Sequence, residues 1–390
     1  MRYLDVPIMV IFWICAAAVV YAYLAYPLVI WALAKCFGRD RHAPHHAREE
    51  LPSVSLLVAA HDEEAVIAQR LINALAMDYP PERLQIAVAC DGCTDATASI
   101  VQSFAGRGVK LLKFKRRRGK AAVLNAAIPE LAGQIVILSD ANTDIDPAAP
   151  RKLIRWFTDP RVGAVCGRLV LTDPLTGRNA DSIYWKYETF LKRCESRLGA
   201  LLGANGAIYA IRRNLFVPIP DGTIVDDFVL PLLTTLKNRC AIIYENEAIA
   251  SEETPADLRS EFRRRSRIGA GDFQSLGTLW RLLDPRRGWI AFTFLSHKIL
   301  RWLCPFFILS LMVCNLFLLH RPLYRYTLLL QAGWLLASAV SCIVPTHIRV
   351  LKPLRLTLMF TSMNAALLVG FFRWIKGGQS GVWQRTARAA

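Results

Sequence analysis

The feature that most constrains this fold is an apolar segment near the start of the chain. Residues 7–34 contain no charged side chain, and Lys35, Arg39 and Arg41 follow them closely. A bilayer-spanning helix needs roughly 20 apolar residues, and basic residues mark its cytoplasmic side. A signal peptide has a shorter apolar region and a small-residue cleavage site, whereas Trp, Tyr and Pro run through this segment. We therefore expect residues 1–38 to form a retained anchor whose C-terminal side faces the cytoplasm.

The composition indicates a folded domain combined with membrane segments. The 390 residues are 54% hydrophobic and 20% charged, which excludes a disordered chain. The 48 Lys and Arg against 31 Asp and Glu leave a net charge of +17. Such an excess is typical of proteins that bind nucleic acid or anionic membranes. Because so much apolar sequence lies beside the charges, we expect a lipid bilayer and no nucleic acid as partner.

Three further apolar stretches follow position 280, and short basic breaks separate them. They cover residues 299–319, 326–345 and 354–372. We expect an interfacial amphipathic helix at 281–302, membrane helices within 303–375 and a basic tail at 376–390. Three crossings after a cytoplasmic domain would leave the basic tail outside, against the positive-inside rule. Whether one stretch re-enters or lies in the membrane plane therefore stays open.

The middle of the chain, residues 50–280, has the pattern of an α/β domain. Continuous apolar runs without alternation predict strands that are buried on both faces, and they alternate with helical spacing such as that at 64–77. Strands that alternate with helices predict a mostly parallel sheet. The expected strands cover residues 53–60, 84–90, 110–114 and 134–140.

Acidic clusters follow the expected strands, where ligands bind in parallel sheets. They lie at 60–64, 90–95, 139–144 and 225–228. Neither a P-loop nor a GxGxxG fingerprint occurs, and carboxylates in this arrangement suit a hard divalent cation that holds a diphosphate. Asp140 and Asn142 can reach a single ion, with Asp144 as an alternative second ligand. For any one cluster, a turn or helix cap is an equally good interpretation.

The ordered motifs resemble those of the membrane-embedded family-2 glycosyltransferases, which include cellulose, chitin, hyaluronan and poly-N-acetylglucosamine synthases. VAAHDEE is similar to their PAYNEE motif, CDGCTDAT to DDGSTD, GKAAVLN to GKAGALN, and SDANTD to the metal-binding DxD. GANGAIYAIRR resembles the acceptor-side segment, VDD resembles TED, and RRSRI resembles QRxRW. The resemblance covers roughly residues 53–280. It implies a GT-A-type nucleotide-sugar-binding domain with a mostly parallel sheet, flanked by transmembrane helices at both ends.

The resemblance also implies roles for single residues on the donor side. His61 and Glu63 would line the uridine pocket, Asp91 would hold the base or ribose, and Lys120 would approach the diphosphate. Asp140 with Asn142 would bind Mg²⁺ or Mn²⁺. The charged side chains near the end of the domain would neutralise the departing UDP; they are Arg264, Arg265 and Arg267. A basic patch that faces the membrane is a compatible alternative for these arginines.

On the acceptor side, the resemblance implies that Asp227 is the general base, with Asp226 beside it and Asn205 and Gly206 lining the acceptor. Attack on an α-linked sugar phosphate needs a base on one side and charge neutralisation on the other. The expected enzyme is thus an inverting transferase that moves a sugar from a UDP-sugar to a glycan or lipid acceptor. Its catalytic domain would lie on the cytoplasmic side of the plasma membrane, in contact with an accessory membrane or export protein.

The sequence departs from the family pattern at the motif that bears on extension of a growing glycan chain. RRSRI lacks both the Gln and the Trp of QRxRW. A β-linked exopolysaccharide synthase and an enzyme that adds one sugar to a lipid-linked acceptor therefore both remain open. A non-catalytic membrane scaffold would be expected to lose the base and metal positions, but Asp91, Asp140 and Asp227 are intact. A transporter would need charged side chains within its membrane spans, and the apolar stretches of this sequence offer almost none.

Overall fold

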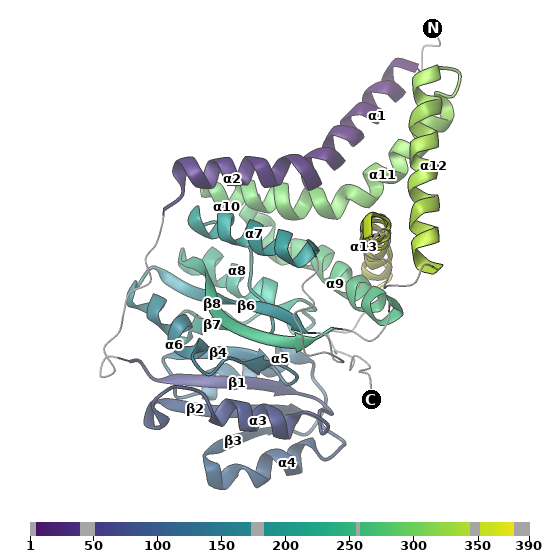
Figure 1. Ribbon diagram of the computed structural model, residues 1–390. Helices are drawn as coiled ribbons and strands as arrows, with labels where there is room; N and C mark the ends of the chain where they lie inside the picture. Colours follow the sequence, from purple (N-terminus) through teal and green to yellow (C-terminus); the bar gives the residue numbers. More distant parts are fainter. Residues whose placement is uncertain (1–4, 40–50, 173–182, 255–257, 344–351, 378–390) are drawn as a thin grey trace. The chain divides into compact units, whose positions relative to one another are not determined.

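The computed structural model describes residues 5–39, 51–172, 183–254, 258–343 and 352–377 (Figure 1). Contacts between Cα atoms divide the chain into two compact units. Of the described residues, the helical unit contains 5–29, 258–273, 294–343 and 352–377, and the sheet unit contains 30–39, 51–172, 183–254 and 274–293. The expected basic tail from 378 onwards lies outside the described residues.

The sheet unit is built on one eight-stranded sheet in the order β3-β2-β1-β4-β7-β6-β8-β5, and Figure 1 labels these strands except β5. The pairs β3–β2, β2–β1, β1–β4 and β6–β8 are parallel, and the pairs β4–β7, β7–β6 and β8–β5 are antiparallel. The strands are β1 Val54–Ala60, β2 Leu84–Asp91, β3 Val109–Phe114, β4 Ile135–Asp140, β5 Asp144–Ile145, β6 Val162–Thr172, β7 Tyr209–Arg212 and β8 Ala241–Glu253.

Four of these strands confirm the apolar runs of the sequence. Every residue of β1 is buried, as expected of a strand that is covered on both faces. Leu56, Val58 and Ile137 belong to one apolar core, which α3 Ile67–Leu75, α4 Thr97–Ser103 and α6 Ala149–Ile154 complete. Other helices of the sheet unit are α5 Lys120–Ala127, α7 Ile183–Arg197, α8 Asp226–Asn238 and α10 Trp289–Thr293.

The described residues contain four helices that are long and apolar enough to cross a membrane. The first, Asp5–Phe37, joins α1 Asp5–Val20 to α2 Tyr26–Phe37 through a π-helical turn. The second, Trp289–Phe317, joins α10 to α11 Leu300–Phe317 and passes without a break through the boundary expected near 302. The third is α12 Pro322–Ile343, and the fourth, Leu354–Ile375, lies within α13 Lys352–Ile375.

Within the helical unit, α1 packs on α11, and small residues allow α9 Leu258–Leu279 to approach α13 closely. A Cβ atom added to Gly370 of α13 would lie 2.7 Å from the backbone nitrogen of Ala270 in α9. Many apolar side chains of the long helices remain exposed, including Leu24 and Leu330, which are 67% and 74% exposed. An apolar exterior of this kind is suited to lipid.

Candidate active site

Three parallel strands bring the acidic clusters to one edge of the sheet. Ala60 at the end of β1 pairs with Cys90 of β2, and Ala59 pairs with Asp140 at the end of β4. Because these strands run in parallel and in register, the residues that follow them emerge side by side. The register of these strands therefore brings together the acidic clusters that follow β1, β2 and β4, as expected.

The loop after β1 is held tightly to the loop after β2. The Nδ1 atom of His61 donates a hydrogen bond of 2.6 Å to the backbone oxygen of Asp91, and its Nε2 atom lies 3.4 Å from Asp62 Oδ2. Asp62 has a φ of +51° and accepts a hydrogen bond of 2.7 Å from the backbone nitrogen of Thr94. Glu63 is buried, and its backbone oxygen accepts the first amides of α3. This region therefore has a fixed backbone that could receive a planar ligand.

One group of side chains in these loops also resembles a metal site. Potential ligand atoms of His61, Asp62 and Cys93 lie within 4.8 Å of one another. All three already have partners within the loops. His61 donates to the backbone oxygen of Asp91, Asp62 accepts backbone amides, and the thiol of Cys93 donates to the oxygen of Ala60 at 3.5 Å. These contacts explain the cluster as part of the loop structure.

Asp91 organises the segment that leads into α5. Its side chain is fully buried, and its two carboxylate oxygens accept hydrogen bonds from the backbone nitrogens of Arg118 at 2.7 Å and Gly119 at 2.8 Å. Gly92 has a φ of +59°, and a Cβ atom there would lie 2.5 Å from the backbone nitrogen of Arg117. Asp91 thus holds the loop that positions Lys120 at the first turn of α5. The expected contact between Asp91 and a base or ribose stays a prediction.

Lys120 connects two of the acidic clusters. Its Nζ atom lies 2.7 Å from Asp140 Oδ1 and 3.2 Å from Asp226 Oδ2, so one ammonium bridges the end of β4 and the start of α8. Burial disfavours the charged ammonium, but the carboxylates of Asp140 and Asp226 outweigh this effect and raise the pKa of Lys120. The side chain therefore carries its positive charge at neutral pH.

Asp226 is the most strongly perturbed acid of this site. Burial raises its pKa to about 6; Lys120 opposes this rise, and the carboxylates of Asp227 and Asp140 add to it. The side chain is only 6% exposed. A buried carboxylate with a raised pKa among other acids is typical of a functional site.

Asp227 and Asp140 lie on either side of Gly206. The backbone nitrogen of Gly206 donates a hydrogen bond of 2.9 Å to Asp227 Oδ2. A Cβ atom added to Gly206 would lie 3.3 Å from Asp140 Oδ2 and 3.4 Å from Asp227 Oδ2. The absence of a side chain at this position therefore leaves a gap of about one methyl group beside the two carboxylates, which a Cβ atom would crowd.

The other expected metal ligands are exposed. Asn142 lies in the turn after β4, and Asp144 begins β5. Behind this turn lies Arg70 of α3, which is 2% exposed and donates a hydrogen bond of 2.8 Å to Asn73. Burial lowers the pKa of Arg70 to about 10, although the carboxylates of Asp144 and Asp140 oppose the shift. Arg70 is a buried positive charge near these two acids that the sequence reading missed.

The three arginines of the expected leaving-group site lie on α9. Both Arg264 and Arg265 pair with Glu261, with Nε–Oε distances of 2.9 Å and 2.6 Å. These residues and Arg267 belong to the helical unit, whereas the carboxylates belong to the sheet unit. Their contact with a departing nucleotide stays a prediction.

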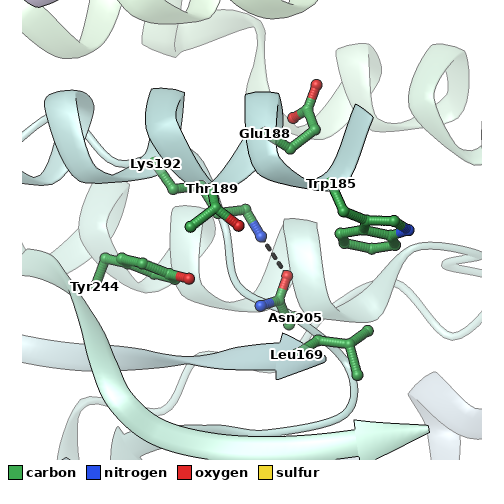
Figure 2. Close-up of a pocket in the computed structure, with 7 residues that line it drawn as sticks. All are labelled: Leu169, Trp185, Glu188, Thr189, Lys192, Asn205 and Tyr244. Carbon is green, nitrogen blue, oxygen red and sulfur yellow. Dashed lines mark hydrogen bonds between the residues drawn. The ribbon is translucent and has the colours of Figure 1, made fainter. Parts of the chain in front are cut away.

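A small pocket above the sheet contains side chains that no motif identified. It is lined by Trp185, Glu188, Thr189 and Lys192 of α7 together with Leu169 of β6, Tyr244 of β8 and Asn205 (Figure 2). The α7 residues recur at helical spacing, which is a signal visible in the sequence but common to any helix that packs on a sheet. Of the expected acceptor residues, Asn205 lines this pocket, and the backbone nitrogen of Gly206 donates a hydrogen bond to Asp227.

Comparison with known proteins gives a consistent picture. Residues 55–216 match the model of the family described as glycosyl transferase family 2. The chain is 32% identical over 162 residues to the beta-monoglucosyldiacylglycerol synthase of Nostoc sp. (strain PCC 7120), covering 40% of this chain and 33% of that protein. It is 27% identical over 241 residues to the poly-beta-1,6-N-acetyl-D-glucosamine synthase of Staphylococcus aureus (strain COL), covering 58% and 56%. The matches thus span between a third and just over half the length of these relatives.

Among solved structures, the mannosyltransferase PcManGT from Pyrobaculum calidifontis, in complex with GDP-Man and Mn²⁺, is similar in fold. The TM-score is 0.72 at 21% sequence identity, and the alignment covers 95% of this chain and 100% of that one. The fold is therefore GT-A-like, with a mixed, mostly parallel sheet and apolar helices at both ends. This confirms the fold class that the sequence predicted.

Proposed function

We propose that the protein is an inverting glycosyltransferase, because residues 55–216 match the model of the family described as glycosyl transferase family 2. It transfers a sugar from a nucleotide sugar, which we take to be a UDP-sugar, to a hydroxyl of a membrane-associated glycan or lipid. The observation that carries this proposal is the grouping of Asp227 and Asp140 across the side-chain-free Gly206, with Lys120 bridging Asp140 and Asp226.

The donor diphosphate would bind at the ends of β2 and β4. Lys120 is a partly buried cation whose present partners are carboxylates, so a diphosphate that arrives there finds a permanent positive charge. The loop residues His61, Glu63 and Asp91 form the fixed backbone beside it and are our candidates for contact with the base and ribose. Arg264, Arg265 and Arg267 are our candidates for neutralising the leaving nucleotide.

The donor atoms around Asp140 also fit a divalent cation. Asp140 and the exposed Asn142 offer oxygen ligands, which are the type that Mg²⁺ and Mn²⁺ prefer. When bound there, such an ion would supply Lewis-acid neutralisation of the diphosphate charge. Lys120 already pairs with one oxygen of Asp140, so this lysine and an ion would share that carboxylate.

Asp227 would act as the general base on the acceptor side. The hydrogen bond from the Gly206 amide fixes one of its oxygens, and the opening above Gly206 separates it from Asp140. A carboxylate in this position can accept the proton of an acceptor hydroxyl as that oxygen attacks the anomeric carbon from the face opposite the nucleotide. Such an attack inverts the configuration of the sugar and gives a β-linkage from an α-linked donor.

Two acceptor classes have support from the relatives. The Staphylococcus aureus relative is named for a β-1,6-linked polysaccharide, which agrees with a β-linked exopolysaccharide as product. The Nostoc relative is named for a glucosylated diacylglycerol, which supports a single transfer to a lipid. The four apolar helices favour an acceptor that the membrane retains in either case, with the catalytic domain in the cytoplasm.

The test is nucleotide release by the full chain in nanodiscs with Mg²⁺ or Mn²⁺. UDP-glucose, UDP-N-acetylglucosamine, UDP-galactose, UDP-glucuronate and GDP-mannose would be compared as donors, and the products would be sized. We expect Asp227→Asn to lower transfer by about 100-fold or more, as loss of a general base does. Asp221→Asn is the matched control, because Asp221 is exposed and contacts only Asn125 among the bonds described.

A ladder of products would assign the exopolysaccharide class, and a single addition would assign the lipid class. Transfer that is unchanged in Asp227→Asn would refute the role of this residue as base. Release of GDP and not UDP would correct the donor class and leave the proposed mechanism in place.

A further inference from the structure

A buried tyrosine lies on the same face of the sheet as the acidic side chain at the end of β4. Tyr209, the first residue of β7, is 1% exposed and lies directly opposite Leu138 of β4. Opposed residues of two paired strands point to one face of a sheet, and so do residues two positions apart on one strand. Tyr209 therefore shares its face with Leu138 and with Asp140, the candidate metal ligand.

The hydroxyl of Tyr209 has no hydrogen-bond partner among the residues that the structure describes. A buried tyrosine hydroxyl usually finds a partner, and a buried donor without one costs folding free energy. Tyr79, by comparison, is 5% exposed and donates a hydrogen bond of 2.6 Å from its hydroxyl to the backbone oxygen of Pro52. Packing alone would be served equally well by phenylalanine at position 209, so the hydroxyl points to a second state of the site in which it has a partner.

The carboxylate that acts most strongly on Tyr209 is that of Asp226. Burial is the main cause of the raised pKa of Tyr209, and the charge of Asp226 is the next; Asp227 and Asp140 contribute less. The hydroxyl therefore keeps its proton and can donate it in a hydrogen bond. Asp226 Oδ2 is itself buried and accepts no hydrogen bond from the described residues, although an ammonium lies near it. A donor without an acceptor and an acceptor without a donor thus lie in the same enclosed region.

The ammonium beside Asp226 belongs to Lys120, which the proposed function would draw away. Its Nζ atom lies 3.2 Å from Asp226 Oδ2 and 2.7 Å from Asp140 Oδ1. A diphosphate carries more negative charge than either carboxylate, so it competes strongly for this ammonium. Asp226 is 6% exposed, so water can hardly replace the lost cation. A buried carboxylate that loses its counter-ion is costly unless another donor satisfies it.

Resting on the proposed function, we propose that Tyr209 is a positioning residue whose hydroxyl donates a hydrogen bond to Asp226 when the donor diphosphate binds Lys120. The phenol then replaces the ammonium as the partner of Asp226 Oδ2, and Lys120 can turn to the diphosphate without leaving a buried charge unsatisfied. The first turn of α8 keeps its place, and with it Asp227, the proposed base. Tyr209 acts through Asp226 and touches neither the sugar nor the acceptor.

The test is nucleotide binding by the full chain in nanodiscs. Calorimetry would measure the affinity for UDP and for GDP, each with Mn²⁺, and melting temperatures would be recorded without nucleotide. Wild-type protein would be compared with Tyr209→Phe and with Tyr79→Phe. Tyr79→Phe is the matched control, because it removes the same hydroxyl from a buried tyrosine that already has a partner.

The two variants should differ in opposite directions. We expect Tyr209→Phe to bind the nucleotide about 10-fold more weakly or worse, since it loses a hydrogen bond to a charged group that forms only in the bound state. Its melting temperature without nucleotide should be unchanged or higher, because the lost hydroxyl had no partner there. Tyr79→Phe should melt at a lower temperature, since it loses the bond to Pro52, and should bind the nucleotide like wild type.

A double-mutant cycle shows whether Tyr209 acts through Asp226. Asp226→Ala removes the acceptor, so adding Tyr209→Phe to that variant should change the nucleotide affinity by no more than about 2-fold, as for groups that do not interact. An infrared difference spectrum between nucleotide-bound and nucleotide-free protein gives an independent readout. A phenol C–O band that shifts on nucleotide binding should appear in wild type and in Tyr79→Phe and be absent from Tyr209→Phe.

Several results would overturn the inference. They are equal nucleotide affinities of wild type and Tyr209→Phe, a melting temperature that falls as far in Tyr209→Phe as in Tyr79→Phe, an undiminished effect of Tyr209→Phe beside Asp226→Ala, and a missing phenol band in wild type. Wild-type protein that binds neither nucleotide would contradict the proposed function and, with it, the inference. Transfer that persists in Asp227→Asn would contradict the proposed base alone.

Discussion

At the scale of single residues, the site combines one ammonium group with aspartates that differ in burial and in hydrogen-bond partners. Lys120 lies between Asp140 and Asp226, and its raised pKa keeps it charged. Asp226 is buried beside Asp227, burial raises its pKa to about 6, and its carboxylate pairs with Lys120 at 3.2 Å. Asp227 has a hydrogen-bond partner in the Gly206 amide and adjoins the open space beside Asp140. This difference in environment supports Asp227, and not Asp226, as the base.

The raised pKa of Asp226 predicts a pH-dependent loss of stability. An unfolded Asp titrates near 3.8, and the folded residue titrates near 6, so the folded state binds more protons between these values. Ionised Asp226 therefore destabilises the fold increasingly as the pH rises from about 4 to 6, and fully above that range. Asp226→Asn should raise the free energy of unfolding at pH 7.5 by on the order of 1–3 kcal/mol.

The measurement is the melting temperature of wild-type and variant protein in detergent with a chelator, at pH 7.5 and pH 4.5. The stabilisation by Asp226→Asn should be clear at pH 7.5 and small at pH 4.5, while Asp221→Asn should change neither. An Asp226→Asn variant that is less stable than wild type at pH 7.5 would show that the pairing with Lys120 outweighs burial.

At the scale of elements, close backbone contact holds α9 to α13. Gly370 of α13 meets Ala270, Gly269 and Ser266 of α9, and each of these backbone atoms would lie within 2.8 Å of an added Cβ. Small residues at such crossings allow helices to approach closely, and dispersion then acts over the whole contact. Since α9 carries Arg264, Arg265 and Arg267, this crossing also helps to determine where these arginines lie within the helical unit.

Gly370→Ala should therefore loosen the helical unit. Because the neighbouring atoms are backbone atoms that cannot rotate away, the added methyl group must separate the helices, at a cost of roughly 1–3 kcal/mol. Gly333→Ala in α12 is the matched control, since a Cβ atom there meets nothing within 4 Å. We expect a melting temperature several degrees lower for Gly370→Ala and an unchanged or slightly higher one for Gly333→Ala, which gains helix propensity. Equal effects of both substitutions would contradict this account of the crossing.

At the scale of the whole molecule, two properties could hold this protein at a membrane. Four helices are long and apolar enough to cross it. The net charge of +17 could also bind anionic lipid heads without any crossing. Their physical signatures differ, because electrostatic attraction is screened by salt whereas burial of apolar helices is not.

We expect the full chain to remain with the membrane after washing with 1 M salt (~3 Å Debye length) and then with alkaline carbonate, and to be extracted only by detergent. Immunoblots of the pellet and supernatant after each wash would measure this, with a peripheral basic protein as control. Release by salt or carbonate would indicate surface binding and would exclude the four helices as spans.

The sequence by itself determined the elements whose signal is local. The continuous apolar run at 53–60 predicted β1, and the runs ending at 90 and 140 predicted β2 and β4, because a strand buried on both faces must be apolar throughout. The alternation of strands and helices predicted acidic clusters at one edge of a mostly parallel sheet, and the resemblance of the ordered motifs to those of family-2 glycosyltransferases implied the GT-A-like class.

What only the tertiary structure decided are the contacts between groups far apart in the chain. Neither the bridge of Lys120 between Asp140 and Asp226, nor the opening at Gly206, nor the burial of Arg70 leaves a periodic signal in the sequence. The same holds for the pocket in which Lys192 meets Asn205. Residue spacing shows which face of a helix or strand is apolar. Only the packing of α7 on β6 and β8 determines which polar side chains meet in the pocket between them and whether each finds a partner.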